Sequence, residues 1–221
     1  MAGPSYRRVA WAAATVAWLV AGGCSDPTAS LGSGSTEETI KALRACTRTR
    51  DPDVVDRVAD AVSHRDTMVA AEAVRCLGRM RTDPAVEVLE GIAAGDRDRR
   101  SALRQEAVIQ LGRQRQASDT ARATLREVVQ LDPDPRVRAA AATSLAQHRS
   151  LLDVPLLIEV AERETDRVVQ ARAVGAVERL VGLRFGYDPT ASKAERQGAL
   201  QRLRRIATPA AASVRRVREQ Q

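Results

Sequence analysis

The sequence feature that most constrains the fold is an eleven-residue motif that recurs five times along the chain. Each copy has alanine at its fourth position, and successive alanines lie 31, 34, 34 and 32 residues apart. These alanines are Ala42, Ala73, Ala107, Ala141 and Ala173. An internal period of this length is typical of proteins that stack one helical unit on the next. The sequence therefore predicts an all-α solenoid of about five helix pairs.

The apolar residues around each alanine predict the buried face of the first helix in each unit. Four residues before the alanine, in the last four units, stand Val69, Leu103, Val137 and Val169. Four residues after it stand Cys46, Leu77, Leu111, Leu145 and Val177. Residues at a spacing of four share one helical face. The small alanine between them lets neighbouring helices approach to about 8 to 10 Å.

A second apolar helix is predicted after the first helix in each unit. Its apolar positions in the first four units are Val55, Val58, Val62, Val86, Leu89, Ile92, Leu125, Val128, Val154, Leu157 and Val160. The turns contain helix-starting pairs such as Asp83 before Pro84, with Asp as the N-cap and Pro at the first helical position. Acidic motifs at 51–53, 96–98 and 132–134 recur at these turns. We interpret them as N-caps, since no calcium-loop register of glycine and glutamate follows.

The segment DPRVRAAAATSL, residues 134–145, resembles HEAT-like repeats, including the related phycobilisome-lyase type. It has an aspartate, a valine three residues later, an arginine, then alanines and a leucine. Asp66 with Val69 repeats the beginning of this pattern, as does Asp166 with Val169. The resemblance covers about residues 37–206 and weakens in the first and last units, as is typical of capping repeats. It implies an extended binding surface in place of a catalytic pocket.

The second helices of such a solenoid present a row of charged residues to a partner. The predicted row consists of Arg57, Asp60, Glu87, Glu90, Arg126, Glu159 and Glu162. From it we take Arg57, Glu87, Arg126 and Glu159 as candidate contacts with a protein partner. The resemblance also leaves open a lyase-like or small-ligand-binding protein. No nucleophile and base cluster is visible, and fold alone does not carry activity, so no enzyme is predicted.

Phe185 and Tyr187 are the only aromatic residues after residue 18, and they lie in an insertion of about eleven residues within the last unit. One interpretation is that they pack over the exposed end of the stack, which the turn-forming Gly182 and Gly186 favour. The other is that they form a recognition loop for a partner. The helix after the insertion is predicted to bury Leu200, Leu203 and Ile206.

The first residues have the pattern of an export signal. Two arginines precede twelve apolar or small residues that end at Val20, a run too short to span a hydrocarbon core, which needs about 20 residues. The following LVAGGC resembles the lipobox of bacterial lipoproteins, which implies removal of residues 1–23 and lipidation of Cys24. An ordinary cleaved signal with a coincidental cysteine is the alternative. Residues 24–36 are rich in Ser, Gly and Thr and predict a flexible tether.

The positive charge of the chain is concentrated near its C-terminal end. The formal net charge is +7, and residues 193–221 contain eight basic and two acidic residues, a net +6. A basic tail over 208–221 can assist membrane attachment, since each basic residue near an anionic membrane contributes about 1 kcal/mol. A solvated last helix explains the same charges and is the favoured interpretation. Nucleic acid is not predicted as a partner, because the export signal opposes it and no aromatics alternate with the basic residues.

The remaining reactive side chains predict no chemistry. His64 and His148 lack companions at metal-ligand spacing, and we expect both in solvent-exposed turns. Cys46 and Cys76 occupy similar positions in neighbouring first helices. Two buried thiols are favoured over a disulfide, which needs a Cα separation of about 4.4 to 6.8 Å, shorter than the usual helix spacing. No metal, cofactor or catalytic residue is predicted.

Together these observations predict a lipid-anchored protein of the bacterial cell envelope, on the periplasmic or outer-membrane side. Its repeat domain spans residues 37–207, between the tether and the basic tail. Its predicted function is that of a non-catalytic scaffold or adaptor for a protein partner whose identity the sequence does not give.

Overall fold

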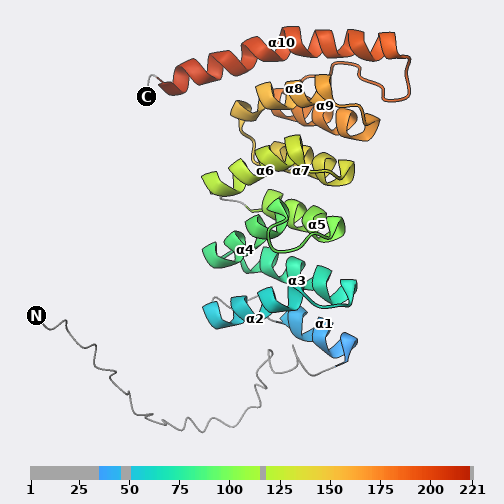
Figure 1. Ribbon diagram of the computed structural model, residues 1–221. Helices are drawn as coiled ribbons and strands as arrows, with labels where there is room; N and C mark the ends of the chain where they lie inside the picture. Colours follow the sequence, from blue (N-terminus) through green and yellow to red (C-terminus); the bar gives the residue numbers. More distant parts are fainter. Residues whose placement is uncertain (1–34, 46–50, 115–117, 220–221) are drawn as a thin grey trace, which may run out of the picture.

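The computed structural model describes residues 35–45, 51–114 and 118–219, with side chains as far as Thr208 (Figure 1). These ranges contain ten α-helices, one short 3₁₀ helix and no strand. In chain order the elements are α1 Thr36–Ala45, α2 Pro52–Val62, α3 Thr67–Met80, α4 Asp83–Ala94, α5 Ser101–Gly112, α6 Asp119–Leu131, α7 Pro135–Gln147, η2 Leu151–Asp153, α8 Val154–Arg163, α9 Arg167–Val181 and α10 Lys193–Glu219. The predicted all-α solenoid is confirmed. The predicted signal peptide and Cys24 lie outside the described residues.

Odd-numbered helices are the first helices of the units and form one side of the stack, while α2, α4, α6 and α8 form the other (Figure 1). Each of α2, α4, α6 and α8 packs more extensively on the first helix of the following unit than on the first helix of its own. First helices also pack on one another along the stack. One continuous hydrophobic core therefore runs through all the units.

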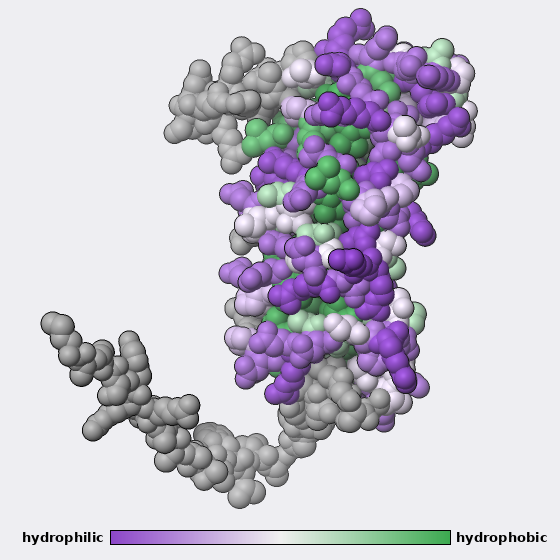
Figure 2. All heavy atoms as spheres, viewed as in Figure 1, coloured by the Kyte–Doolittle hydropathy of each residue, from purple (hydrophilic) through white to green (hydrophobic). Residues whose placement is uncertain are grey.

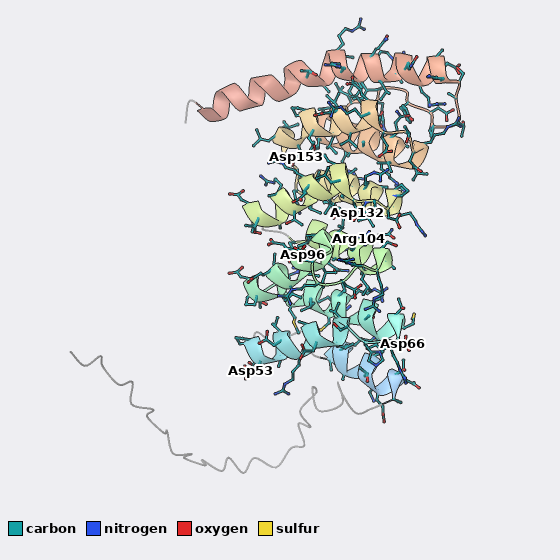
Figure 3. All side chains as sticks on the ribbon, viewed as in Figure 1. Asp53, Asp66, Asp96, Arg104, Asp132 and Asp153 are labelled. Carbon is teal, nitrogen blue, oxygen red and sulfur yellow. The ribbon has the colours of Figure 1, made fainter. Side chains whose placement is uncertain are left out.

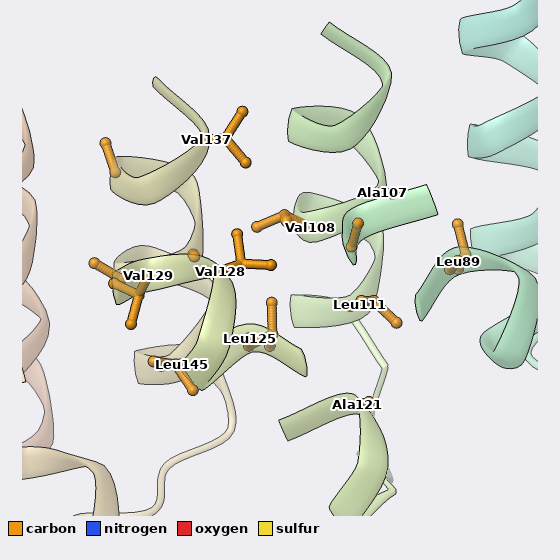
Figure 4. Packing of buried hydrophobic residues seen from close by; sticks show 14 of the residues in the cluster. Leu89, Ala107, Val108, Leu111, Ala121, Leu125, Val128, Val129, Val137 and Leu145 are labelled. Atoms are coloured by element: carbon orange, nitrogen blue, oxygen red, sulfur yellow. The ribbon is translucent and has the colours of Figure 1, made fainter. Parts of the chain in front are cut away.

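The predicted core positions of the first helices are confirmed. All five marker alanines are buried, as are the described apolar residues four positions before and after them. Figure 4 shows the middle of this core, where Val108 of α5 lies beside Val128 of α6 and Leu111 points toward Leu89 of α4. Cys46 lies outside the described residues. Among the predicted positions of the second helices, only Val86 is half-buried instead of buried.

Aspartate side chains start several helices, as the sequence predicts. Asp51, Asp66, Asp134 and Asp166 are the N-caps of α2, α3, α7 and α9, and each accepts a hydrogen bond from the backbone N–H two residues later. The prediction for Asp83 is wrong by one residue, because Thr82 is the N-cap of α4 and Asp83 is its first helical residue. A carboxylate in the first turn still interacts favourably with the helix dipole.

Two glycines let the first helices approach more closely than alanine allows. A Cβ atom added to Gly112 of α5 would lie 2.9 Å from the Cα atom of Ser144 in α7. A Cβ atom added to Gly78 of α3 would lie 2.7 Å from the Cβ atom of Gln110 in α5. The Ser144 hydroxyl donates to the Val108 carbonyl at 3.0 Å across the same contact. Close approach therefore depends on these glycines as well as on the predicted alanines.

The stack ends with α10, which crosses over the last unit (Figure 1). It buries Leu200 and Leu203 as predicted, but Ile206 is 43% exposed and Ala207 is buried instead. Neighbouring residues of a helix are rotated by about 100°, so when Ala207 faces the core Ile206 turns toward solvent. The helix continues through the predicted boundary at residue 208 as far as Glu219.

Candidate functional site

A buried ion pair joins two successive units at the edge where second helices lead into first helices. Arg104 of α5 donates from Nε to one carboxylate oxygen of Asp132 at 2.7 Å and from Nη2 to the other at 3.0 Å. The two side chains are 9% and 4% exposed. The hydrogen bonds to Asp132 raise the pKa of Arg104, so this guanidinium stays charged in the folded protein. Figure 3 shows Arg104 and Asp132 at this edge, and Asp53 and Asp153 toward the opposite edge.

The same arrangement recurs one unit later. Arg138 of α7 donates to the two carboxylate oxygens of Glu164 at 2.8 and 3.1 Å. Burial raises the pKa of Glu164, but the hydrogen bonds from Arg138 and from two backbone amides outweigh burial and leave the pKa below its ordinary value. We call the edge that carries Arg104–Asp132 and Arg138–Glu164 the ladder edge.

Glutamine takes the place of arginine in the last unit. Gln170 lies 32 residues after Arg138, and its Nε2 donates to the Ala161 carbonyl at 2.7 Å. Its Oε1 accepts a hydrogen bond from the hydroxyl of Tyr187. The insertion therefore supplies a phenol where the two earlier units supply a carboxylate.

The other aromatic residue of the insertion lies inside the core. Phe185 is 4% exposed, and its backbone N–H donates to Glu178 at 2.8 Å. Arg202 of α10 donates to the Phe185 carbonyl at 3.2 Å. Tyr187 is half-buried at the border of the same core. This arrangement supports the interpretation that the insertion packs over the end of the stack, and it leaves the Phe185 ring covered.

The charged residues proposed for the second helices are distributed one to a helix. Arg57 on α2, Glu87 on α4 and Glu159 on α8 are exposed. Glu159 also forms an ion pair with Arg163, with Nη1 and Oε1 2.6 Å apart. Arg126 on α6 is half-buried and donates to Oδ1 of the fully buried Asp153 at 2.6 Å. The structure thus aligns the four residues along the stack without bringing them together, and it engages Arg126 in an internal ion pair.

Two cavities lie next to each other on the ladder edge. One of about 370 Å³ lies between the C-terminal ends of α4 and α6, and its lining includes Ala94, Val128 and Leu131. The other, of about 320 Å³, lies between α6 and α8, and its lining includes Leu131, Glu159 and Val160. Of the four candidate contact residues, only Glu159 lines either cavity.

Leu131 forms the ridge between the two cavities and is 72% exposed. Sequence analysis missed it. The available signal was an apolar residue directly before an aspartate turn, outside the face that Leu125, Val128 and Val129 share. Figure 2 shows a mainly hydrophilic face in which hydrophobic atoms come to the surface between the upper units.

Comparisons with known proteins agree with this architecture. A family model described as HEAT repeats matches residues 28–105 and 96–178, which together span more than half of the chain. The chain belongs to the HEAT-repeat family. Among 17 matching chains of solved structures, the crystal structure of an engineered protein is 19% identical, covers 83% of this chain and 95% of its own, and has a TM-score of 0.47. A search of curated proteins finds no match.

The two histidines of this HEAT-repeat protein have structural partners. His64 accepts the backbone N–H of Asp66 on Nδ1 at 3.0 Å. His148 follows α7 and is half-buried, and its Nε2 donates to the Leu111 carbonyl at 3.1 Å. Burial lowers the pKa of His148 below its ordinary value. The expectation of solvent-exposed turns is wrong for both histidines, because both are half-buried, and His148 also bonds a carbonyl of the preceding first helix.

The acidic turn motifs of this HEAT-repeat protein have two roles. Asp51 and Asp134 cap helices, whereas Asp98 and Asp132 accept hydrogen bonds from Arg100 and Arg104. The prediction that all three motifs act as N-caps is therefore only partly correct, because Asp98 bonds the side chain of the α5 N-cap residue Arg100, and Asp132 bonds Arg104 of the preceding first helix. In the described ranges, no three His, Cys, Asp or Glu side chains gather in a way that suits a metal ion.

The structure describes one of the two cysteines that the sequence analysis compared. Cys76 is fully buried in α3, while Cys46 lies outside the described residues, so the expected pair of buried thiols stays a prediction. Among the helices that the structure describes, none is long and apolar enough to cross a membrane.

Proposed function

We propose that this HEAT-repeat protein is a lipoprotein of the bacterial cell envelope that holds a protein partner without catalysis. The observation that carries the binding part is Leu131, 72% exposed between two cavities on the ladder edge. Exposed apolar surface with a rim of polar residues marks sites of protein interaction and ligand-binding grooves. The partner contributes an apolar side chain to at least one of the two cavities.

The charges around Leu131 favour a polar protein partner over a lipid surface. Arg99 and Glu127 line the first cavity, and Glu159 and Arg163 line the second. A mixture of both signs around an apolar centre matches the polar rim of protein interfaces. The buried pair Arg104–Asp132 and the half-buried pair Arg138–Glu164 fix the turns beneath this surface. A surface that is already rigid loses less conformational entropy when the partner binds.

Membrane attachment is proposed through Cys24, on the basis of the signal and lipobox pattern in residues 1–24. Acyl chains contribute about 0.8 kcal/mol for each buried methylene, and a durable anchor needs two signals. The second signal is additional acylation or the basic residues of α10. Cell fractionation tests the anchor. Cys24→Ser is expected to move the protein from the membrane fraction to the soluble fraction, and unchanged retention contradicts lipid attachment.

Crosslinking in native membranes followed by affinity purification tests the partner. We expect one enriched protein with the wild-type chain, and its loss with Leu131→Glu, which places a charge between the two cavities. Met68→Glu is the matched control, because Met68 of α3 is 65% exposed and lines neither cavity. Both variants are first compared with the wild type by circular dichroism and thermal unfolding.

The possible outcomes of the crosslinking experiment test the binding surface and the scaffold function separately. A partner retained by Leu131→Glu contradicts the ladder edge as the binding surface. No enriched protein with the wild-type chain contradicts the scaffold function. A change in the absorbance spectrum of a bilin on mixing with the protein, in the absence of any protein partner, would favour the lyase-type alternative.

A further inference from the structure

A second concave surface lies on the side of the stack formed by the first helices. A cavity of about 420 Å³ lies between α7, α9 and the start of the insertion, lined among others by Thr143, Arg172, Gly175 and Arg179. A neighbouring cavity of about 320 Å³ continues over α7 and shares Thr143 and Arg172 with it. We call the two together the α9 trough. None of its lining residues lines the two cavities beside Leu131.

Gly175 leaves the floor of the trough open, although no neighbouring helix packs closely enough to require a glycine there. A Cβ atom added to Gly175 would meet nothing within 4 Å, whereas one added to Gly78 or Gly112 would collide with the neighbouring helix. Glycine inside a helix is less stable than alanine by about 0.5 to 1 kcal/mol. The helices on both sides therefore do not require this glycine, and its effect is to keep the space between Arg172 and Arg179 free.

The walls of the trough carry uncompensated positive charge. Arg172 and Arg179 are exposed, and neither forms an ion pair or hydrogen bond with a residue that the structure describes. The carboxylate of Glu178, the one acid in the larger cavity's lining, is already engaged, since it accepts from the Phe185 backbone at 2.8 Å and from Arg184 at 3.2 Å. Three guanidinium groups thus share the larger cavity with one carboxylate.

The spacing of the two arginines selects the shape of the ligand. Arg172 and Arg179 lie seven residues apart on one face of α9, which corresponds to about 10 Å at 1.5 Å per residue. A ligand with two carboxylates about this far apart can engage both guanidinium groups at once. An extended chain in the polyproline II conformation rises about 3.1 Å per residue and has three residues per turn, so acidic side chains three residues apart lie on one face and match this separation.

From these observations we infer that the α9 trough binds an extended acidic segment of another protein, with carboxylates on Arg172 and Arg179 and backbone over Gly175. Charge-assisted bonds from guanidinium to carboxylate supply the recognition. Nucleic acid fits less well, because single-stranded binding sites combine cations with aromatic stacking platforms, and Phe185 is buried in the core. This binding site does not depend on the anchor at Cys24 or on the surface around Leu131.

Fluorescence anisotropy with the full chain, purified in detergent, tests the inference. The probe is a fluorescein-labelled peptide of repeated Glu-Ser-Gly, which places a carboxylate at every third residue. We expect saturable binding that weakens as salt is added, as interactions between exposed charges do. Arg172→Gln with Arg179→Gln is expected to weaken binding at least about tenfold. Gly175→Leu is expected to abolish binding without changing charge, because its side chain fills the trough.

The matched control is Arg65→Gln with Arg113→Gln, which removes the same charge from exposed arginines outside the trough. Equal weakening by the two double variants would show that net charge alone binds the peptide and would overturn the inference. So would equal affinity for a peptide of identical composition with its glutamates adjacent, tighter binding of an oligothymidylate of equal charge, or unchanged binding by Gly175→Leu. Circular dichroism establishes that each variant is folded.

Discussion

The contact between α5 and α7 and the closure of the last unit by α10 complete the same core by different means. In the middle, Gly112 lies against Ser144 so closely that no Cβ atom fits between them. Arg104 of α5 also forms an ion pair with Asp132, in the turn between α6 and α7. At the end, α10 packs more on α8 than on α9, and Phe185 from the insertion lies buried in the core. Where the neighbour is another copy of the unit, small residues and a repeated ion pair are sufficient. Where the neighbour is different, one large aromatic side chain replaces them.

Removing the ion pair of the middle region is expected to have the largest effect. Asp132→Ala leaves Arg104 charged and buried without a partner, and loss of one member of a buried pair costs about 3 to 5 kcal/mol. Urea denaturation measures the loss in the free energy of unfolding. The double variant Arg104→Met with Asp132→Leu is expected to recover much of it, since no charge then remains buried. A loss below about 1 kcal/mol for Asp132→Ala would show that solvent reaches the pair.

Removing the aromatic ring of the end region is expected to have the next largest effect. Phe185→Ala leaves a cavity, and such truncations cost about 3 to 5 kcal/mol in a closed core, with the lower limit expected at the end of a stack. Because each unit contacts only its neighbours, the loss should be local. Hydrogen exchange is expected to accelerate in α10 and to stay unchanged in α5. Faster exchange across the whole chain would contradict the local role of the insertion.

Two glycine substitutions are expected to act in opposite directions. Gly112→Ala forces α5 away from α7, and overpacking of this kind costs about 1 to 3 kcal/mol. Gly175→Ala adds a methyl group to open space and gains about 0.5 to 1 kcal/mol from helix propensity. Thermal unfolding therefore should show a lower melting temperature for the first variant and a higher one for the second. The same sign for both would mean that α9 is packed as closely as α5.

The smallest expected effect concerns pH. Burial lowers the pKa of His148 from its ordinary 6.5, an effect only partly opposed by its hydrogen bond to Leu111 and by Asp153, and increased by Arg122. The unfolded chain therefore takes up this proton at higher pH than the folded chain does. The corresponding stability is complete above about pH 6.5 and is lost as pH falls through the folded pKa.

His148→Gln is expected to flatten this part of the pH dependence. The substitution is mild because Gln114, in the preceding unit, already donates from Nε2 to the Gly78 carbonyl at 3.0 Å. Urea midpoints measured between pH 5 and pH 7 provide the comparison, given an ordinary histidine pKa of about 6.5. An unchanged slope in the variant would assign the acid sensitivity to other groups.

The sequence was sufficient for those parts of the fold that depend on spacing along one helix. The alanines, the apolar residues four positions away and the aspartate caps all follow from periods of 3.6 residues and from local backbone chemistry. Ile206 shows the limit of that reasoning, because only the packing of α10 on α8 decides whether Ile206 or Ala207 turns inward.

The candidate site depended more on contacts between units, which spacing along one helix does not determine. Asp132 resembles an N-cap in the sequence, and its role became clear only when Arg104, 28 residues away, was found beside it. Gly112 is the ninth residue of its repeat motif and Gly175 the sixth of its own, but the sequence does not show that an added Cβ atom would collide at the first and meet nothing at the second. Leu131 could have been noticed as an apolar residue outside the periodic face, but the cavities beside it are lined by residues from α4, α5, α6, α7 and α8.

The way in which α10 covers the last unit also limits how copies of this protein can assemble. An array of similar units with an apolar final surface can accept the first unit of a second copy, and head-to-tail contacts that do not close produce filaments. Here Leu200 and Leu203 face inward, while Arg204 and Arg205 are exposed. A second copy would have to desolvate these cations to add to the end. The covering of the last unit by α10 therefore opposes growth of a fibre from this side of the unit.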